Sequence, residues 1–160
     1  MSTHKPKSKP KSSLIVSNKK AYHDYHVEET LVAGIVLTGT EIKSIRNGKV
    51  SMSNSYARIK DGEVFLSGMN ISPYEQGTHY NHEPERIRKL LLNRKEIRKL
   101  VGKIQQSSYT LVPLKLFFSR CWVKVELGLC KGKKKHDKRD ALTQRSHQRE
   151  MDRARKANPY

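Results

Sequence analysis

The sequence predicts a mainly β fold, an OB-type antiparallel β-barrel with added helices and basic N- and C-terminal tails. Apolar, β-rich runs recur along the middle of the chain and are joined by turn signals, which is typical of antiparallel strands. Two amphipathic segments with helical spacing interrupt these runs. The chain of 160 residues is long enough for about one domain. A small closed or nearly closed barrel best accommodates five or six such strands with inserted helices.

Most of the net positive charge lies at the two ends of the chain. Six lysines and no acidic residue lie in residues 1–20, and eleven basic residues with four acidic ones lie in residues 131–160. We therefore expect a disordered basic arm at 1–13, a barrel at 14–130 and a basic tail at 131–160. The net charge of +18 favours a nucleic-acid partner.

The first predicted strand covers residues 22–37, which are rich in β-branched and aromatic residues. Gly34 within it indicates a bulge or a sharp bend. Thr38 and Glu41 then have the spacing of a capping box, and Gly48 can end a helix in the left-handed conformation. This pattern predicts a short helix at about 40–47.

Asp61-Gly62 between two alternating apolar runs predicts a β-hairpin, because this dipeptide favours the tight turns that join antiparallel strands. Residues 73–83 contain Pro, Gly, Asn and histidines without a period and predict a loop.

A second cap signature, Asn93 with Glu96, begins the clearest helix of the sequence. Its apolar residues follow the spacing of one helix face and predict a helix at about 94–105. The residues before Asn93 fit either a helix or a strand. Two apolar runs at 108–119 and 120–130 predict a second hairpin, with Pro113 at an edge or a bulge.

The composition also indicates the compartment. No run of about 18 apolar residues is present, and the N-terminus lacks the apolar centre of a signal peptide, so we expect a soluble, cytoplasmic protein without a membrane partner. Cys121 and Cys130 lie in apolar, strand-like runs and are expected to be reduced core thiols.

The sequence contains no pattern that supports an enzyme, a metal or a cofactor. Gly128 and Gly132-Lys133 are spaced too closely for a phosphate-binding loop, and no Ser or Thr follows the lysine. The pairs His23/His26 and His79/His82 have spacings that a metal could use, but no cysteine pair or HExxH helix accompanies them. We expect these histidines to be solvated.

Basic residues of the body are interleaved with aromatic and polar ones, as in Asn18-Lys19-Lys20-Ala21-Tyr22 and in Lys124 after Trp122. Cations neutralise phosphates and aromatic rings stack on exposed bases, so this mixture suits a folded RNA. An ordinary solvated surface is the alternative for each single residue.

The C-terminal segment "ALTQRSHQREMDRARKA" consists of good helix formers, but Leu142 and Met151 are its only sizeable apolar residues. It therefore cannot stay folded by itself. As a helix it would align Arg145, Arg149 and Arg153 in one cationic stripe along a phosphate backbone. An inert disordered tail is the alternative.

These residues resemble the SmpB family, the SsrA-binding proteins of bacterial trans-translation. The similarity covers nearly the whole chain and is carried by blocks in the family's order: "NKKAYHDY", "GTEIKSIRNGK", "DGEVFLSGMNISPY", "RKLLLN" and "KVELGLCKGKKKHDKR". The resemblance implies a non-enzymatic OB-fold protein that binds the tRNA-like domain of tmRNA and delivers it to ribosomes stalled on messages without a stop codon. The alternative is a general single-stranded RNA-binding protein or ribosome-associated OB-fold chaperone.

The resemblance also implies the contact residues of a protein expected to be a monomer. On the body, the RNA-facing residues would be Asn18, Lys19, Lys20, Tyr22, Arg46, Leu91, Asn93 and Lys124. The tail, disordered when free and helical on the ribosome, would enter the decoding centre and the empty mRNA channel. Its contacts would be Lys131, Gly132, Lys133, Lys134, His136, Asp137, Lys138, Arg139, Arg145, Arg149 and Arg153, with His136 stacked on a base.

Overall fold

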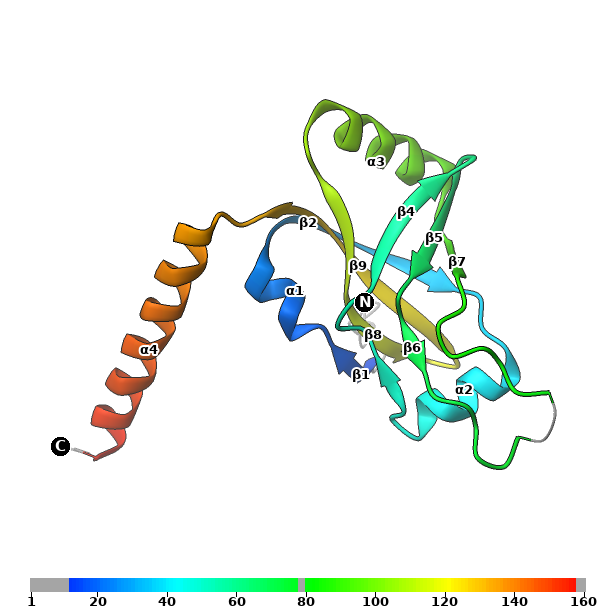
Figure 1. Cartoon of the computed structure of the whole chain (residues 1–160), viewed down its shortest axis with the longest axis horizontal. Coiled ribbons are helices and arrows are strands. Elements are labelled where there is room, and N and C mark those ends of the chain that lie inside the picture. Colours follow the sequence, from blue (N-terminus) through cyan, green and yellow to red (C-terminus); the bar gives the residue numbers. More distant parts are fainter. Residues whose placement is uncertain (1–11, 78–79, 158–160) are drawn as a thin grey trace, which may run out of the picture.

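An antiparallel β-sheet that closes into a ring forms most of the molecule, and one long helix extends away from it (Figure 1). The computed structural model describes residues 12–77 and 80–157, and it describes the side chains of these residues except Ser12, 135–141, 156 and 157. The strands are β1 (Ser12–Ser17), β2 (Tyr25–Ile35), β3 (Val50–Ser51), β4 (Tyr56–Lys60), β5 (Glu63–Ser67), β6 (Asn70–Ile71), β7 (Arg88–Leu91), β8 (Thr110–Ser119) and β9 (Trp122–Gly132). The helices are α1 (Lys19–Asp24), α2 (Gly39–Arg46), α3 (Arg94–Gln106) and α4 (Lys135–Ala157).

The strand order confirms the predicted barrel. The main sheet runs β1-β8-β4-β5-β7-β2-β9, and an additional pairing of β8 with β9 closes it into a ring. Strand β1 lies outside this ring, on the edge of β8. Strands β3 and β6 form a separate small sheet. Each junction of the ring has at least two residue pairs except that between β4 and β8, where Ala57 and Leu111 make the single pair.

Both predicted hairpins are confirmed. Asp61 and Gly62 have φ values of 53° and 72°, the left-handed conformation that a two-residue hairpin turn requires. Strands β8 and β9 pair along their length, and the register shifts between Pro113 and Lys115, as expected for a proline within a strand.

The two predicted helices of the body, α2 and α3, are confirmed together with their caps. Thr38 with Glu41 and Asn93 with Glu96 both form capping boxes. Gly48 follows α2 with a φ of 71°. The ambiguous segment before Asn93 is strand β7. The described parts of the predicted loop, 73–77 and 80–83, contain neither helix nor strand.

The prediction for the first strand was wrong in two details. Tyr22 belongs to helix α1, and β2 begins at Tyr25. Of the two alternatives predicted for Gly34, a bulge is wrong, because the register shift of β2 lies between Val27 and Glu29, and a sharp bend stays a prediction. Gly34 instead permits a close approach, because a Cβ at this position would lie 3.3 Å from the Cβ of Leu91. Strand β1 and helix α1 were not predicted.

Two hydrophobic cores hold these elements together. The larger core fills the ring with residues such as Val64, Leu66 and Leu127, and α3 closes it with Ile97 and Leu100. The smaller core lies between α1 and the outer face of β8 and β9, and consists of Ala21, Val112, Leu114 and Cys130. Helix α1 is therefore fixed to the outside of the barrel by buried apolar contacts.

The cysteines differ from each other in burial. Cys130 is a buried core thiol, as predicted, and burial raises its pKa to about 11. Cys121 is exposed at the turn between β8 and β9, so the prediction of a core thiol was wrong there. The turn itself, not the apolar run around it, determines the exposure of Cys121.

A buried ion pair joins α2 to the first residue of β7. Glu41 and Arg88 are both fully buried, and the Arg88 Nε donates to the Glu41 Oε1 at 2.8 Å. Arg86 donates to the other carboxylate oxygen, Oε2, at 2.6 Å. Burial alone would raise the pKa of Glu41, but hydrogen bonds from Arg86 and the Thr38 N–H and the charge of Arg88 hold it below its usual value.

His82 lies beside this ion pair and corrects the expectation of a solvated histidine. Its ring is buried, with Nδ1 3.0 Å from the Thr40 Oγ1 and Nε2 2.9 Å from the Ile71 carbonyl oxygen. His23 is half-buried beside Asp24, and His26 is exposed. His79 lies outside the described residues.

None of the helices in the described part of the chain has the length and apolar character that a membrane span requires.

Candidate nucleic-acid interface

Asn18 fixes the start of helix α1 with a fully used side chain. Its Oδ1 accepts from the Ala21 N–H at 3.1 Å and caps the helix, while its Nδ2 donates to the carbonyl oxygens of Met52 at 2.9 Å and Pro113 at 3.1 Å. The residue is only 4% exposed. This geometry favours a role in positioning the lysines that follow, and a direct RNA contact by Asn18 stays a prediction.

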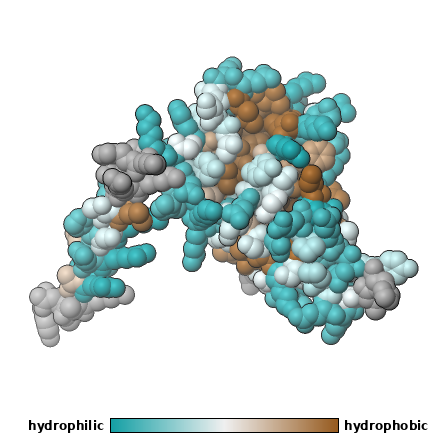
Figure 2. Space-filling model, in the orientation of Figure 1, coloured by the Kyte–Doolittle hydropathy of each residue, from teal (hydrophilic) through white to brown (hydrophobic). Residues whose placement is uncertain are grey.

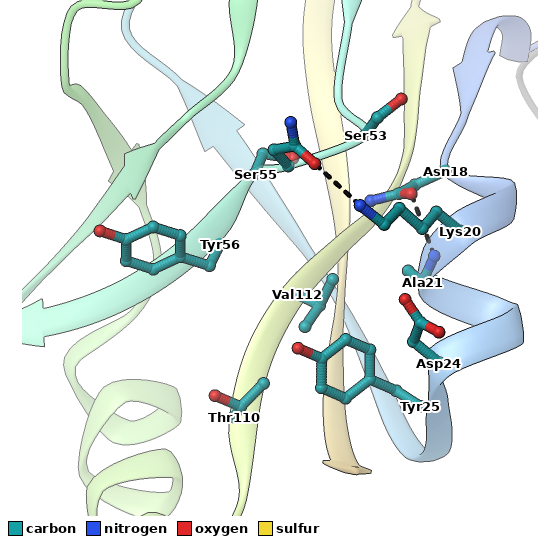
Figure 3. Close-up of a pocket in the computed structure, with 11 residues that line it drawn as sticks. Asn18, Lys20, Ala21, Asp24, Tyr25, Ser53, Ser55, Tyr56, Thr110 and Val112 are labelled. Atoms are coloured by element: carbon teal, nitrogen blue, oxygen red, sulfur yellow. Dashed lines mark hydrogen bonds between the residues drawn. The ribbon is translucent and has the colours of Figure 1, made fainter. Parts of the chain in front are cut away.

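Lys19 and Lys20 are exposed at the start of α1. The Lys20 Nζ donates to the Asn54 Oδ1 at 3.0 Å, across a cleft of about 400 Å³ between α1 and the chain that leads into β4. Figure 3 shows Lys20 pointing from α1 across this cleft toward the segment with Ser53 and Ser55. Lys20 therefore faces a polar segment, residues 53–55, on the opposite side of the cleft.

The root of the C-terminal tail is attached to the other end of α1. Gly132 pairs with Tyr25, and the next residue, Lys133, donates its backbone N–H to the Asp24 carbonyl oxygen at 3.0 Å. The Lys133 Nζ donates to the carbonyl oxygen of Tyr22 at 3.1 Å. A cation at the carboxyl end of a helix is favourable, because the last carbonyl groups carry partial negative charge. Lys131 and Lys134 are exposed beside it. We call Lys19, Lys20, Tyr22 and Lys131–Lys134 the α1 surface.

The tail continues from this surface as helix α4, which extends away from the barrel (Figure 1). Its apolar residues Leu142 and Met151 are 49% and 54% exposed. Arg145, Arg149 and Arg153 are exposed and lie at i, i+4 and i+8 of the helix, so they share one face. His136, Asp137, Lys138 and Arg139 belong to the first turns of α4, but their side chains lie outside the described ones.

The remaining predicted contacts gather around a second, more apolar hollow. Leu91 and Lys124 line one groove of about 510 Å³ between β2, α2, β7 and the β8–β9 turn. Trp122 lines the same groove and is 73% exposed, and Leu91 is 52% exposed. We call it the Leu91 groove; its full lining is Gly34, Ile35, Val36, Leu37, Ile42, Leu91, Cys121, Trp122, Val123 and Lys124.

Arg46 and Asn93 do not line this groove, but they follow its lining residues Ile42 and Leu91 closely in sequence. Arg46 is exposed and follows the lining residue Ile42 by four positions on α2, so both lie on one helix face. Asn93 is exposed two residues after Leu91 and begins α3, where its backbone N–H donates to the Glu96 Oε2 at 2.9 Å. The helix cap of Asn93 is therefore confirmed, and its RNA contact stays a prediction.

The α1 surface and the Leu91 groove lie at opposite ends of the ladder that joins β2 and β9. Tyr25 pairs with Gly132 at the α1 surface, and Gly34 pairs with Lys124 at the Leu91 groove. Nine residues of strand separate these pairs, which corresponds to roughly 30 Å. The structure thus divides the predicted contacts into a cationic surface and an apolar groove with cations beside it.

Two aromatic residues line these hollows beside the predicted contacts, and the sequence analysis did not single them out as contacts: Trp122 and Tyr56. Trp122 entered the sequence analysis only as a neighbour of Lys124, and Tyr56, which is 47% exposed at the α1 cleft, did not enter it. Exposed aromatic residues in strands next to lysines were the available signal. Among the described residues, no group of three His, Cys, Asp or Glu side chains is arranged to hold a metal ion.

Comparison with known proteins identifies relatives over almost the whole chain. The family model described as SmpB protein matches residues 15–157. The SsrA-binding protein of Geobacillus kaustophilus is 58% identical over 146 residues, which are 91% of this chain and 94% of that protein. The SsrA-binding protein of Syntrophobacter fumaroxidans is 53% identical over 156 residues, 98% of this chain and 97% of that protein.

A solved structure has a similar fold. One chain of the structure called "tmRNA-SmpB: a journey to the center of the bacterial ribosome" superposes with a TM-score of 0.63 at 48% sequence identity. The match covers 79% of this chain and 93% of that chain.

Proposed function

The chain belongs to the SmpB protein family, and we propose that it binds the tRNA-like domain of tmRNA (SsrA RNA) and delivers this RNA to stalled ribosomes for trans-translation and peptide tagging. Like the other members of its family, the protein is a binding factor and not an enzyme. One observation of the structure supports this function above the others. The predicted contacts form two surfaces at the two ends of one ladder, and the tail leaves from one of them.

The body contacts suit an RNA whose shape is fixed. At the Leu91 groove, Leu91 and Trp122 offer apolar surface for sugars and unstacked bases, Lys124 in the lining supplies a cation for a phosphate, and the exposed Arg46 supplies a second one from α2. At the α1 surface, Lys19 and Lys20 are held in place by the Asn18 cap. Two rigid surfaces roughly 30 Å apart recognise the spacing of phosphates on a folded RNA, which a flexible single strand cannot match.

The tail acts on a second partner. Helix α4 presents Arg145, Arg149 and Arg153 on one face and has no apolar face to bury, so its free energy of binding comes from phosphates. We propose that it enters the decoding centre and the empty mRNA channel of the small ribosomal subunit, with His136 stacked on a base and Asp137 orienting Lys138 and Arg139. A monomer suffices for this function, and the site of action is the cytoplasm.

Truncation after Lys134 tests the division of labour. This chain keeps the Lys133 hydrogen bonds to α1 and removes only α4. We expect unchanged affinity for the tRNA-like domain in a filter-binding assay and loss of peptide tagging in a reconstituted translation reaction stalled on a message without a stop codon. Tagging at the full-length rate would contradict the role of the tail.

The role of His136 is tested by comparison with His147, a second histidine on the same helix. His136→Ala should abolish most tagging while leaving the affinity for free tmRNA intact, because the ring stacks only in the ribosome. The matched control is His147→Ala, which changes an exposed histidine on the same helix and should tag normally. Equal loss of tagging in both variants would reduce the tail to simple electrostatics.

A competition experiment separates this function from general single-strand binding. Labelled tRNA-like domain is held by the full chain and challenged with unlabelled tRNA-like domain or with unstructured RNA of the same length. We expect the unstructured RNA to displace it poorly at physiological salt. Equal displacement would favour the general OB-fold binder or chaperone, which recognises phosphates and bases without shape.

A further inference from the structure

The shortest strand pairing of the barrel ring lies between β4 and β8, and it is flanked by hollows on both sides. Ala57 and Leu111 are the single residue pair across this seam. One hollow is the cleft of about 400 Å³ beside α1, and the other, of about 530 Å³, lies beneath the C-terminal half of α3. Both hollows are lined by Tyr56 and Thr110. We call the two together the seam groove.

Tyr56 is the side chain between the two hollows. Along β4, Tyr56, Arg58 and Lys60 are exposed and Ala57 is buried, so these three side chains lie on the outer face of the barrel. Tyr56 is 47% exposed, and Figure 3 shows its ring projecting from β4 away from Lys20. A large aromatic ring on an outer strand face between two concave surfaces offers a stacking platform from either side.

The two hollows carry cations at their outer parts. Lys20 lines the first hollow, where its Nζ donates to the neutral Asn54 side chain and forms no ion pair with the residues that the structure describes. Arg58 lines the second hollow and forms no ion pair within the described part of the chain. Two acidic residues are near, and both have partners: Asp24 contacts the His23 Nδ1 at 2.9 Å, and Glu28 accepts from the Tyr109 hydroxyl.

The second hollow is apolar inside this polar rim. Val101 and Ile104 of α3 and Leu111 of β8 line it, with the ring of Tyr109 at its edge. Figure 2 shows hydrophobic residues exposed between α3 and β4, framed by hydrophilic ones. The size of each hollow matches that of sites for small ligands, and apolar walls with a few cations at the rim suit a base attached to a phosphate.

We propose that the seam groove binds an unpaired nucleotide of an RNA, with its base stacked on Tyr56 and its flanking phosphates at Lys20 and Arg58. The proposal rests on the proposed function, because it assigns a further contact to the same RNA-binding body. A paired base could not enter the hollows, since its faces are covered by its neighbours in the duplex. Lys20 and Arg58 can neutralise the phosphates that flank such a base, which favours RNA over an uncharged protein segment as the occupant.

Tyrosine replacements on the full chain test the stacking. We expect Tyr56→Ala to weaken the affinity for the tRNA-like domain by about tenfold, in line with the loss of one base–aromatic stack, and Tyr56→Phe to stay within about twofold. Arg58→Gln should weaken binding less and lower its salt dependence, because one phosphate contact is lost. Equal affinities for the Ala variant and the unchanged chain would overturn the proposal.

A fluorescence measurement keeps the test independent of folding effects. Trp122 is the single tryptophan of the chain, so Trp122→Phe combined with Tyr56→Trp leaves one reporter in the seam groove. The matched control combines Trp122→Phe with Tyr80→Trp, in a loop where residues 73–85 hold three acids and no Lys or Arg and where Tyr80 is 91% exposed. Both chains share the Trp122 change, so its effect cancels in the comparison.

The expected result is quenching of the Tyr56→Trp chain by the tRNA-like domain and an unchanged signal of the Tyr80→Trp chain, because only a stacked base quenches the indole. Unchanged emission of the Tyr56→Trp chain at full RNA occupancy in a mobility-shift assay would overturn the seam site and leave the proposed function standing. Absence of any RNA binding by the unchanged chain would instead overturn the proposed function itself. Normal RNA affinity with weaker ribosome cosedimentation for Tyr56→Ala would assign the groove to a ribosomal partner and overturn the RNA proposal.

Discussion

Helices α1 and α4 are both cationic but are held in opposite ways. Helix α1 has only six residues, yet Ala21 is buried in the small core and Asn18 connects its start to Met52 and Pro113. Helix α4 has 23 residues, and its apolar residues Leu142 and Met151 remain about half exposed. Helix length therefore does not decide whether a cation has a fixed position; buried contacts do.

The difference assigns different kinds of recognition to the two helices. Lysines on a fixed helix can match only a partner whose phosphates already have the right spacing, which favours a folded RNA. Arginines on a helix whose apolar residues Leu142 and Met151 stay half exposed can adjust to the shape of a channel as they enter it. The comparison is tested by substitutions whose effect on the free energy of unfolding should fall from the barrel to the tail.

The largest effect is expected at the buried ion pair. Glu41→Ala leaves the Arg88 guanidinium buried without its counter-charge and should lower the free energy of unfolding by about 3–5 kcal/mol. Urea unfolding followed by circular dichroism measures the loss. Glu75→Gln, which removes an exposed partner of Lys49, is the matched control and should unfold at the unchanged midpoint. Similar unfolding midpoints for the two variants would contradict a stabilising role of the Glu41–Arg88 ion pair.

A smaller loss is expected for Asn18→Ala. The variant removes the cap of α1 and leaves the carbonyl oxygens of Met52 and Pro113 without this donor, which should destabilise the protein by about 2 kcal/mol. The affinity for the tRNA-like domain should fall as well, because Lys19 and Lys20 lose their fixed position. If Lys19→Gln lowers the affinity for RNA without changing the stability, Lys19 contacts the RNA itself. Asn18 then acts on the affinity by positioning this lysine. An Asn18→Ala chain with normal affinity would show that the position of α1 is not needed.

Asn93 caps a helix from an exposed position, so its replacement should matter less. Asn93→Ala is expected to lower the free energy of unfolding by about 1 kcal/mol, while Asn93→Ser keeps a capping oxygen and should stay within a few tenths. The serine variant also lacks the amide. Loss of RNA affinity in Asn93→Ser at normal stability would therefore establish an RNA contact, and normal affinity in both variants would leave Asn93 as a cap alone.

The ion pairs that join β2 to α3 give a pH dependence. Hydrogen bonds from Lys103 and Lys99 lower the pKa of Glu29 from 4.5 to about 2. Because the folded-state pKa is the lower one, the contribution is complete above pH 4.5 and disappears as the pH falls toward 2. Glu29→Gln should therefore unfold with a smaller pH dependence between these values than the unchanged chain. Parallel pH profiles of the two chains would show that this pair does not contribute.

The smallest effect on stability is expected in the tail. Replacing Arg145, Arg149 and Arg153 together by Gln should leave the thermal unfolding of the barrel unchanged, because none of them is buried. The same variant should bind stalled ribosomes with a salt-dependence slope that is smaller by about two to three. A lower unfolding temperature would contradict the comparison, since it would show that α4 packs on the barrel.

The elements that were predicted correctly have local signals. The hairpin at Asp61-Gly62, the capping boxes of α2 and α3 and the apolar stripe of α3 all depend on residues within about one or two turns of each other. The stretch "SSLIVS" of β1 has three apolar residues and no turn signal, and its partner β8 lies about a hundred residues later. Helix α1 depends on the contacts of Asn18 with Met52 and Pro113, 34 and 95 positions away.

The candidate contacts were predicted as a set, but their division was not. Composition and the family resemblance pointed to Lys20 and Lys124 alike, and only the register of β2 with β9 places them at opposite ends of a ladder. The apolar hollows around Leu91 and Tyr56 arise where several strands meet, so no single stretch of sequence indicates them. Burial of Asn18 and His82 is equally a property of the assembled fold.

The two cysteines give this molecule a pair of natural chemical reporters. Cys121 is exposed and lines the Leu91 groove, so an RNA seated there should protect its thiol from alkylation. Cys130 is buried in the small core under α1, and its raised pKa of about 11 adds to its protection, so it reacts only when α1 leaves the barrel. One mass-spectrometric alkylation experiment on the unmodified chain therefore measures the occupancy of one surface and the docking of the other at the same time.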